Sequence, residues 1–122
     1  MPGKYIDPEE SERKSREDPG ATLRLHWAVV YHHMDAVEAA LRKGADVDSF
    51  YRNTGLTALH IAVGQNDLPM CQFLVEAAGA SFFADGYGRW PSLVAAECLV
   101  DEELSDFICE AEMAFLQKKF GS

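Results

Sequence analysis

The sequence lacks any hydrophobic run approaching the roughly 18 consecutive apolar residues that a membrane-spanning helix needs. Its first 20 residues also lack the apolar stretch of a secretory signal. We therefore expect a cytoplasmic protein that does not bind membranes. At 122 residues, the chain has room for one domain at most.

Cysteine is scarce, with Cys71, Cys98 and Cys109 the three examples and no CxxC pair among them. An odd number without paired spacing fits a reducing compartment and predicts buried, free thiols. A structural zinc site needs four ligands at close paired spacings, so these thiols do not predict a metal site.

Basic residues are few, since 11 Lys and Arg stand against 20 Asp and Glu, for a net charge of -9. Such a chain would repel phosphates and gain nothing from counterion release, so nucleic acid is excluded as a ligand. The charge favours a partner protein with a basic surface. It is also compatible with an acidic surface that is merely solvated.

Catalytic signatures are missing as well, because the chain has no Walker-type phosphate loop, no GxSxG and no HExxH. Gly86-Tyr87-Gly88 is too short for a dinucleotide fingerprint, and a turn explains it. The acids between Asp101 and Glu110 have no apolar neighbours to raise a pKa, which favours a solvated face over a carboxylate pair. We expect no enzyme, no cofactor and no small-molecule substrate. A docking patch for a basic partner is the other interpretation of these acids.

What the sequence does have is a short motif that repeats. Residues 25–29 (LHWAV) return as residues 59–63 (LHIAV), with four identities in five at a distance of 34 residues. A weaker echo, 93–97 (LVAAE), follows 34 residues later. Self-similarity with this period predicts a stacked array of repeats, and such arrays usually bind other molecules.

Apolar spacing and stop signals divide the repeats into helix pairs. Gly44 and Gly79 are helix stops, and Pro69 fits the first turn of a helix. The predicted helices cover 22–31, 35–43, 57–65, 68–78 and 91–99, and a longer last helix runs from 101 to a stop at Gly121.

The last helix has the pattern of a terminal cap. It carries acids at its start and Lys118-Lys119 near its end, which suits the helix dipole. Its outer face should stay polar because no further repeat covers it. We expect an inward stripe of Leu104, Phe107, Ile108, Ala111 and Phe115, and an outward face of Glu103, Asp106 and Glu110.

Residues 1–20 differ from the rest, with ten charged residues, three prolines and few large apolar groups. Asp7-Pro8-Glu9-Glu10 could begin a short helix. Residues 9–18 have no apolar face to bury, so a flexible arm is predicted, with a polar cover over the first repeat as the alternative. The domain then spans 21–122, with repeats at about 21–53, 54–88 and 89–122.

These motifs resemble the ankyrin repeat. Residues 57–62 (TALHIA) match its Thr-Pro-Leu-His-x-Ala helix start except for the proline. Residues 44–48 (GADVD) match its Gly-Ala-Asp-x-Asn stop with Asp at the end, and 85–91 (DGYGRWP) its turn. The resemblance covers 21 to about 117. It implies an all-α solenoid of three helix–turn–helix repeats with β-turn fingers, the last repeat being a cap.

The resemblance also assigns structural roles. His26 and His60 should hydrogen-bond the backbone of the neighbouring turn rather than act in catalysis or bind metal. His32 and His33 fall in a helix–helix linker and, being adjacent, cannot share one helix face, so they are not expected to bind metal either. Ala28, Ala62 and Ala96 should let neighbouring helices approach closely.

The sequence departs from the family pattern at several positions. Leu23-Arg24 replace the Thr-Pro of the first repeat. The stop glycines are 35 residues apart, so one extra residue is expected, which we place in 76–78. Ser92 looks inserted in the third repeat, with Val94 replacing the motif histidine.

Ankyrin repeats bind along their turn tips and the exposed part of their first helices. Aromatic residues and Arg are frequent anchors of protein interfaces, and several occupy these positions. Some rings could instead fold back on the stack, as Phe82 should and Trp90 could. The expected partner-binding residues are Val30, Tyr31, Phe50, Tyr51, Asn53, Thr54, Leu56, Gln65, Tyr87, Arg89, Trp90 and Leu99.

The resulting prediction is a non-enzymatic module, monomeric on its own, that binds a partner protein through its turn tips and concave face. The alternative is a small acidic inhibitor, such as an immunity protein or antitoxin, of a basic enzyme.

Overall fold

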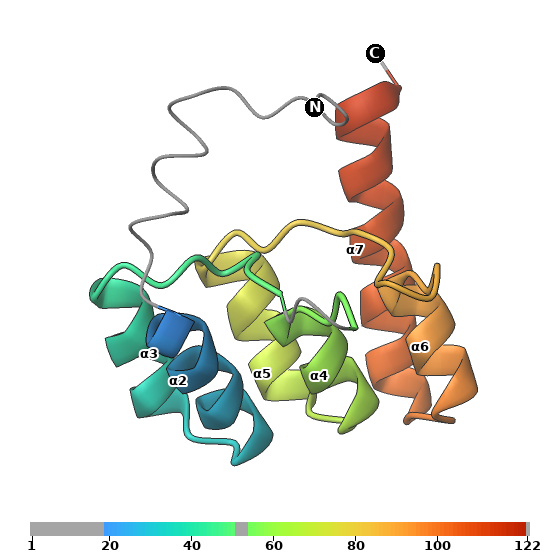
Figure 1. Ribbon diagram of the computed structural model, residues 1–122. Coiled ribbons are helices and arrows are strands. Elements are labelled where there is room, and N and C mark those ends of the chain that lie inside the picture. The colour runs from blue at the N-terminus through green and yellow to red at the C-terminus, as the bar shows by residue number, and fades with distance from the viewer. Residues whose placement is uncertain (1–18, 51–53, 122) are drawn as a thin grey trace.

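The computed structural model describes residues 19–50 and 54–121, which form three helix pairs standing side by side (Figure 1). The first helices of successive pairs pack on one another, α2 on α4 and α4 on α6. In the described ranges the only β-pairing is a single bridge, between Phe50 and Thr57. The all-α solenoid predicted from the repeats is therefore confirmed. The pairs are α2 (Pro19–Val30) with α3 (Met34–Arg42), α4 (Ala58–Gly64) with α5 (Leu68–Gln72) and η1 (Phe73–Ala77), and α6 (Pro91–Glu97) with α7 (Glu102–Phe120).

The repeats share the way in which their first helices end. His32, Asn66 and Leu99 each have a positive φ, of 61°, 60° and 55°, and each lies in the linker before the second helix. Non-glycine residues adopt this conformation rarely, so its return marks equivalent positions. The steps between the three residues are 34 and then 33 positions. The third repeat therefore begins one residue earlier than the 34-residue spacing of the repeated sequence predicts.

This shorter step corrects the predicted register of the third repeat. Trp90 is the N-cap of α6, as Thr57 is the N-cap of α4. Ser92 is therefore not an insertion, and Leu93, rather than Val94, stands where α4 has its histidine. The buried small residue is Ala95, and Ala96, which was expected between the helices, is exposed.

The predicted extra residue of the second repeat is present as a π-helical turn, η1. The N–H of Ala78 donates to the carbonyl of Phe73, five residues back, at 3.0 Å. The hydrogen-bonded turn that ends this helix is also one residue longer than the one that ends α3. The N–H of Ala45 reaches back five residues to Ala40, whereas that of Ala80 reaches back six to Leu74. The turn spans 73–77 and so begins earlier than the predicted 76–78.

The first helix is longer than its counterparts. α2 begins at Pro19 and has 12 residues, whereas α4 and α6 have seven each. Thr57 is the N-cap at which α4 begins. The equivalent position in the first repeat is Leu23, whose side chain cannot cap a helix. The helix therefore continues for another turn toward the N-terminus. The predicted arm covered residues 1–20, of which Pro19 and Gly20 belong to α2 and residues 1–18 lie outside the described residues.

The core follows the predicted apolar stripes. Burying one such side chain stabilises the fold by about 1.5–3 kcal/mol. In α7, Leu104 and Ile108 are fully buried, and Phe107, Ala111 and Phe115 pack against the core, while the acids on the opposite face are exposed. The helix ends at Gly121, as expected. Buried side chains from the other helices include Leu25, Val29, Val37, Leu59, Val63, Met70 and Leu74.

The expectation of buried thiols is correct for one cysteine and wrong for two. Cys71 is buried in α5, where desolvation raises its pKa to about 12, with a further contribution from Asp67. Cys98 caps the end of α6 and Cys109 lies on the outer side of α7, and both are exposed. All three are free thiols.

Candidate functional site

The turns between repeats are held by the two motif histidines, as predicted. The Nε2 of His60 donates to the carbonyl of Arg89 at 3.0 Å, and the Nε2 of His26 donates to the carbonyl of Ser49 at 3.2 Å. Each bond joins a first helix to the turn that follows its repeat. Burial lowers the pKa of both imidazoles more than their backbone hydrogen bonds raise it, so they are neutral near pH 7.

His60 also closes the start of its own helix. Its Nδ1 accepts from the N–H of Thr57, at 3.3 Å, and lies 2.9 Å from the Thr57 hydroxyl. The Thr57 Oγ1 accepts in return from the backbone N–H of His60 at 3.3 Å. One neutral tautomer, with its proton on Nε2, satisfies the cap and the neighbouring turn together.

A second row of bonds ties the helix–helix linkers at the opposite edge of the stack. The Gln65 amide donates to the carbonyl of Val30 at 2.8 Å. His32 Nδ1 meets the Asp67 carboxylate at 2.6 Å. The Asp101 N–H donates to the side chain of Asn66 at 2.9 Å. Each tie joins residues 35 positions apart, and the first two join the first and second helix pairs whereas the third joins the second and third pairs.

The predicted binding residues are divided between these two edges, which corrects the single surface expected from the sequence. Helix α4 separates Thr57, at the turns, from Gln65, at the linkers, by its seven residues, or about 10 Å. Tyr51 and Asn53 lie outside the described residues. We call the turn side the finger edge and the linker side the linker edge. The finger edge holds Phe50, Thr54, Leu56, Tyr87, Arg89 and Trp90, and the linker edge holds Val30, Tyr31, Gln65 and Leu99.

The finger edge is built on the buried carboxylate of Asp85. Its Oδ1 accepts from the N–H groups of Tyr87 and Arg89, at 2.8 and 2.9 Å, and its Oδ2 accepts from the Arg89 guanidinium at 2.9 Å. Burial works against ionisation, but these bonds outweigh it and lower the pKa of Asp85. The turn therefore has a fixed shape around an ionised side chain.

Neighbouring fingers touch through their backbones. The N–H of Gly86 donates to the carbonyl of Thr54 at 2.7 Å. A Cβ on Gly55 would lie 2.4 Å from the Gly86 nitrogen, and one on Gly86 would lie 2.6 Å from the Thr54 oxygen. Gly55 also has a φ of +74°. This approach is open to glycine alone at both positions.

Exposed aromatic rings stand on this rigid edge. Tyr87 is 68% exposed and Phe50 is 52% exposed, although the Tyr87 backbone is fixed by Asp85. Trp90 is partly buried against the core, so its ring folds back on the stack. Phe82 is buried, as predicted, and packs on Phe115 with ring centroids 5.6 Å apart.

Arg89 contributes more to the scaffold than the sequence suggests. Its guanidinium binds Asp85 at 2.9 Å and Glu97 at 3.3 Å, and lies 5.3 Å from the centre of the Tyr87 ring. Hydrogen bonds to the two carboxylates raise its pKa. Its backbone carbonyl also accepts from His60. Arg89 thus holds the turn that presents Tyr87.

The linker edge offers less for recognition. Leu99 is 87% exposed, and Val30 is also exposed. Gln65 is half-buried and uses its amide in the tie to Val30. The Tyr31 ring lies against Trp27, with centroids 5.3 Å apart, away from the finger rings.

Three exposed aromatic residues were missed by the sequence analysis, namely Trp27, Phe83, and Phe120 at the end of α7. Phe83, on the extended segment before the second finger, is 39% exposed. Adjacent side chains of an extended segment point to opposite sides, so the burial of Phe82 was the signal for it. Trp27 was treated only as part of the echo, yet it is exposed at the outer side of the first repeat.

The described residues were also searched for a metal-binding cluster and for a membrane-spanning helix. In residues 19–50 and 54–121, no three His, Cys, Asp or Glu side chains are grouped to hold a metal ion. No helix of the same ranges is both long and apolar enough to span a bilayer.

Comparison with known proteins agrees with this geometry. A family model described as ankyrin repeats in many copies matches residues 25–75. Over these residues the chain is similar to the ankyrin-repeat family. Ankyrin repeats generally mediate interactions between proteins and are typically not catalytic. The family motif explains the paired roles of His26 and His60 in the turns.

The chain is also similar to curated proteins named palmitoyltransferase ZDHHC13. It is 36% identical over 64 residues to those of Homo sapiens and Pongo abelii, and 33% identical over 64 residues to that of Mus musculus. The match covers 52% of this chain and 10% of each relative. The chain thus matches about a tenth of the length of these relatives.

Proposed function

We propose that the chain is a non-enzymatic module that binds a partner protein along its finger edge. The observation that carries this proposal is the exposure of Phe50, Phe83 and Tyr87 along an edge whose turns are held by hydrogen bonds. A turn whose backbone is already fixed loses little entropy on binding, which makes the rings that it carries effective anchors. The linker edge has no comparable set of rings among its predicted residues.

The charge of the chain supports a partner with a basic surface. The net charge is -9, and the acids on the outer side of α7, Glu103, Asp106 and Glu110, are exposed. Opposite charge accelerates association and selects among partners more than it adds affinity. The same acids favour a second candidate function, a small acidic inhibitor of a basic enzyme. We also propose a cytoplasmic location, which the three free thiols support.

Hydrogen exchange on a purified complex tests the proposal. The partner is first isolated from the source cells by affinity capture on the chain and then identified. We expect binding to slow amide exchange at 54–57 and 83–90 and to leave the linkers at 31–33 and 65–67 unchanged. Protection confined to the linkers would contradict the proposal. A fall in association rate with added salt would favour the inhibitor of a basic enzyme, and no such dependence would count against it.

A further inference from the structure

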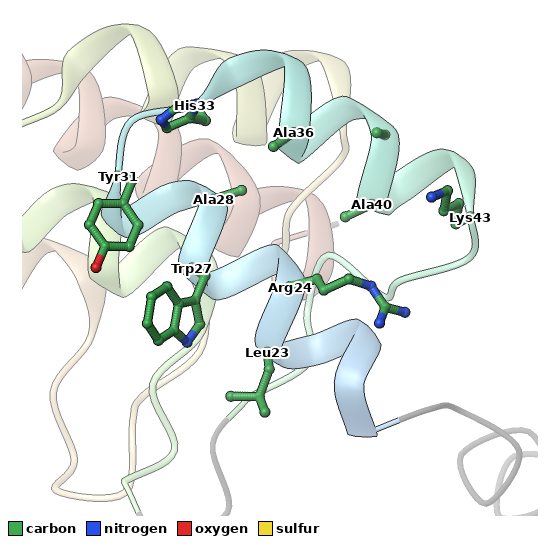
Figure 2. A pocket seen from close by; sticks show the side chains of 10 residues that line it. Leu23, Arg24, Trp27, Ala28, Tyr31, His33, Ala36, Ala40 and Lys43 are labelled. Carbon is green, nitrogen blue, oxygen red and sulfur yellow. The ribbon is translucent and has the colours of Figure 1, made fainter.

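The outer side of the first helix pair contains an apolar hollow of about 610 Å³ (Figure 2). The residues that line it all come from this pair, between Leu23 and Lys43. Leu23, Trp27 and Tyr31 follow one another along its wall, and the two rings are 55% and 56% exposed. Alanines, among them Ala36, form its floor. So large an exposed apolar surface marks a place of contact.

The later repeats show what this side of a helix pair meets in the stack. The positions with positive φ place Trp27 in line with Ile61 of the second repeat and Val94 of the third. Ile61 packs against the core. Val94 is buried, and its Cγ1 would lie 3.9 Å from a Cβ on Gly64 of the preceding pair. In each later repeat this side is therefore covered by the pair before it. Within residues 19–50 and 54–121, no pair stands before the first.

The N-terminal segment, residues 1–18, is joined to the stack at one end of the hollow. It precedes Pro19, the first residue of α2, and Leu23 lies one turn further along that helix. Because α3 runs back along α2, Lys43 lies at this near end, while Tyr31 lies at the far end (Figure 2). A contact between the segment and the hollow is thus intramolecular, with an effective concentration of about a millimolar.

The segment contains apolar side chains within reach of the hollow. Apart from the initial methionine and two prolines, they are those of the adjacent residues Tyr5 and Ile6. Ile6 precedes Pro19 by 13 positions, which span about 20 Å as a helix and up to about 43 Å when extended. The hollow follows about two turns of α2, or roughly 12 Å. Tyr5 and Ile6 can therefore reach it in either conformation.

Charge agrees with this direction of approach. Three acids stand among the four residues that follow Ile6. With Ile6 against Trp27, these acids fall between Trp27 and the near end of the hollow, where Lys43 is exposed. Opposite charges at the same end favour this orientation over the reverse.

A second copy of the chain offers another apolar surface, since Met113 and Phe120 of α7 are exposed, but it lacks the advantage of the tether. We propose that the hollow is the docking site of the chain's own N-terminal segment, with the side chains of Tyr5 and Ile6 against Trp27. The segment then takes the place of a preceding helix pair and closes this end of the stack.

Quenching of Trp27 fluorescence by acrylamide tests the contact in the full chain. The parent for all variants is Trp90→Phe, in which Trp27 is the remaining tryptophan. Replacing Tyr5 and Ile6 together by Ser should raise the quenching constant roughly threefold, as loss of a docked state populated about two-thirds of the time would do. The emission should also move to longer wavelength, because the indole becomes open to water. Circular dichroism confirms that each variant is folded.

Matched controls separate the contact from other effects. The variant Glu12→Ser, Arg13→Ser alters the same segment but keeps its net charge and apolar residues, so it should leave the quenching unchanged. Ala36→Glu puts a charge in the floor of the hollow. It should raise the quenching of the parent and add nothing to that of the Tyr5→Ser, Ile6→Ser variant.

Several outcomes would overturn the proposal. Equal quenching of the parent and of the Tyr5→Ser, Ile6→Ser variant would show that the hollow is open in the free chain and available to a partner protein. Protection that survives deletion of residues 2–18 would also contradict it. Protection that is lost on dilution from about 100 to about 1 µM would make a second copy the occupant, since a tethered contact does not depend on concentration. Tyr87→Ala, on the finger edge, should have no effect, so this proposal and the finger-edge proposal can fail separately.

Discussion

The imidazole Nε2 of His60 lies 3.0 Å from the carbonyl oxygen of Arg89, 29 residues further along the chain. Through the same ring, the start of α4 is capped and the second finger is fixed. Arg89 then uses its guanidinium to hold Asp85 and Glu97. The scaffold histidine is thus connected by two steps to the turn that presents Tyr87.

Replacing His60 by Ala should destabilise the fold by about 3 kcal/mol. The change removes part of a helix cap, leaves the carbonyl of Arg89 with the N–H of Asp85 as its remaining donor and opens a cavity. Urea unfolding followed by circular dichroism measures it. His33→Ala is the control, because His33 is exposed and its side chain makes no cap bond, and it should change stability by less than about 0.5 kcal/mol. Equal effects would show that the His60 contacts contribute nothing.

Stability should fall as the pH drops below about 6.5. The pKa values of His26 and His60 are lowered in the folded state from the ordinary 6.5, so below that value the unfolded chain binds more protons than the folded one. Their contribution is complete above pH 6.5 and is lost on acidification. Asp85 loses its contribution only below its ordinary pKa of 3.8, so it does not act in this window.

Urea midpoints at pH 7.5 and 5.5 test this dependence. The wild type should have the lower midpoint at pH 5.5. His60→Gln, which removes one of the two titrating groups, should show a smaller difference between the two pH values. A midpoint that rises on acidification would contradict the assignment of the neutral imidazoles.

Gly55→Ala should destabilise the chain more than Gly79→Ala. The two glycines have nearly the same φ, +74° and +73°, so the backbone strain of about 1 kcal/mol is common to both. Only the Gly55 Cβ would collide with backbone, at 2.4 Å from the Gly86 nitrogen, whereas nothing lies within 4 Å at Gly79. Thermal unfolding compares them. Equal losses would mean that the fingers do not meet as described.

The three thiols should differ in reactivity with a thiol reagent. Cys98 and Cys109 are exposed and should react within minutes in the folded chain, while Cys71 should react only on unfolding. Burial keeps the reagent away from Cys71, and a pKa raised to about 12 leaves little of its side chain as the reactive thiolate. Mass spectrometry of the labelled, digested protein identifies the sites. Early labelling of Cys71 would show that α5 is not packed as described.

Much of the fold could be predicted because the ankyrin motif combines local signals. The stops at Gly44 and Gly79 and the stripe of α7 follow from single-residue preferences and spacing. The extra residue of the second repeat could be predicted from the spacing of Gly44 and Gly79. Its form as a π turn could not, because that depends on how the α5–η1 helix packs. The register of the third repeat was wrong because 93–96 (LVAA) fits the motif at two alignments. The cap at Trp90 decides between them.

The candidate site was harder to predict, since a repeat motif assigns positions along the chain rather than distances in space. Tyr31 and Tyr87 were grouped because both follow motif residues, yet a helix length separates the edges that carry them. Phe83 was missed because its exposure depends on which side of an extended segment Phe82 occupies. The exposure of Trp27 depends on whether another element packs against the outer side of its helix pair, and the local sequence does not indicate this.

The affinity of the identified partner for two variants tests the central proposal most directly. Tyr87→Ala and Leu99→Ala each remove a largely exposed side chain, one on the finger edge and one on the linker edge. Isothermal titration calorimetry should show that Tyr87→Ala weakens binding by about 2 kcal/mol, roughly thirtyfold, and that Leu99→Ala leaves it unchanged. An unchanged affinity for Tyr87→Ala, together with a loss for Leu99→Ala, would contradict the account.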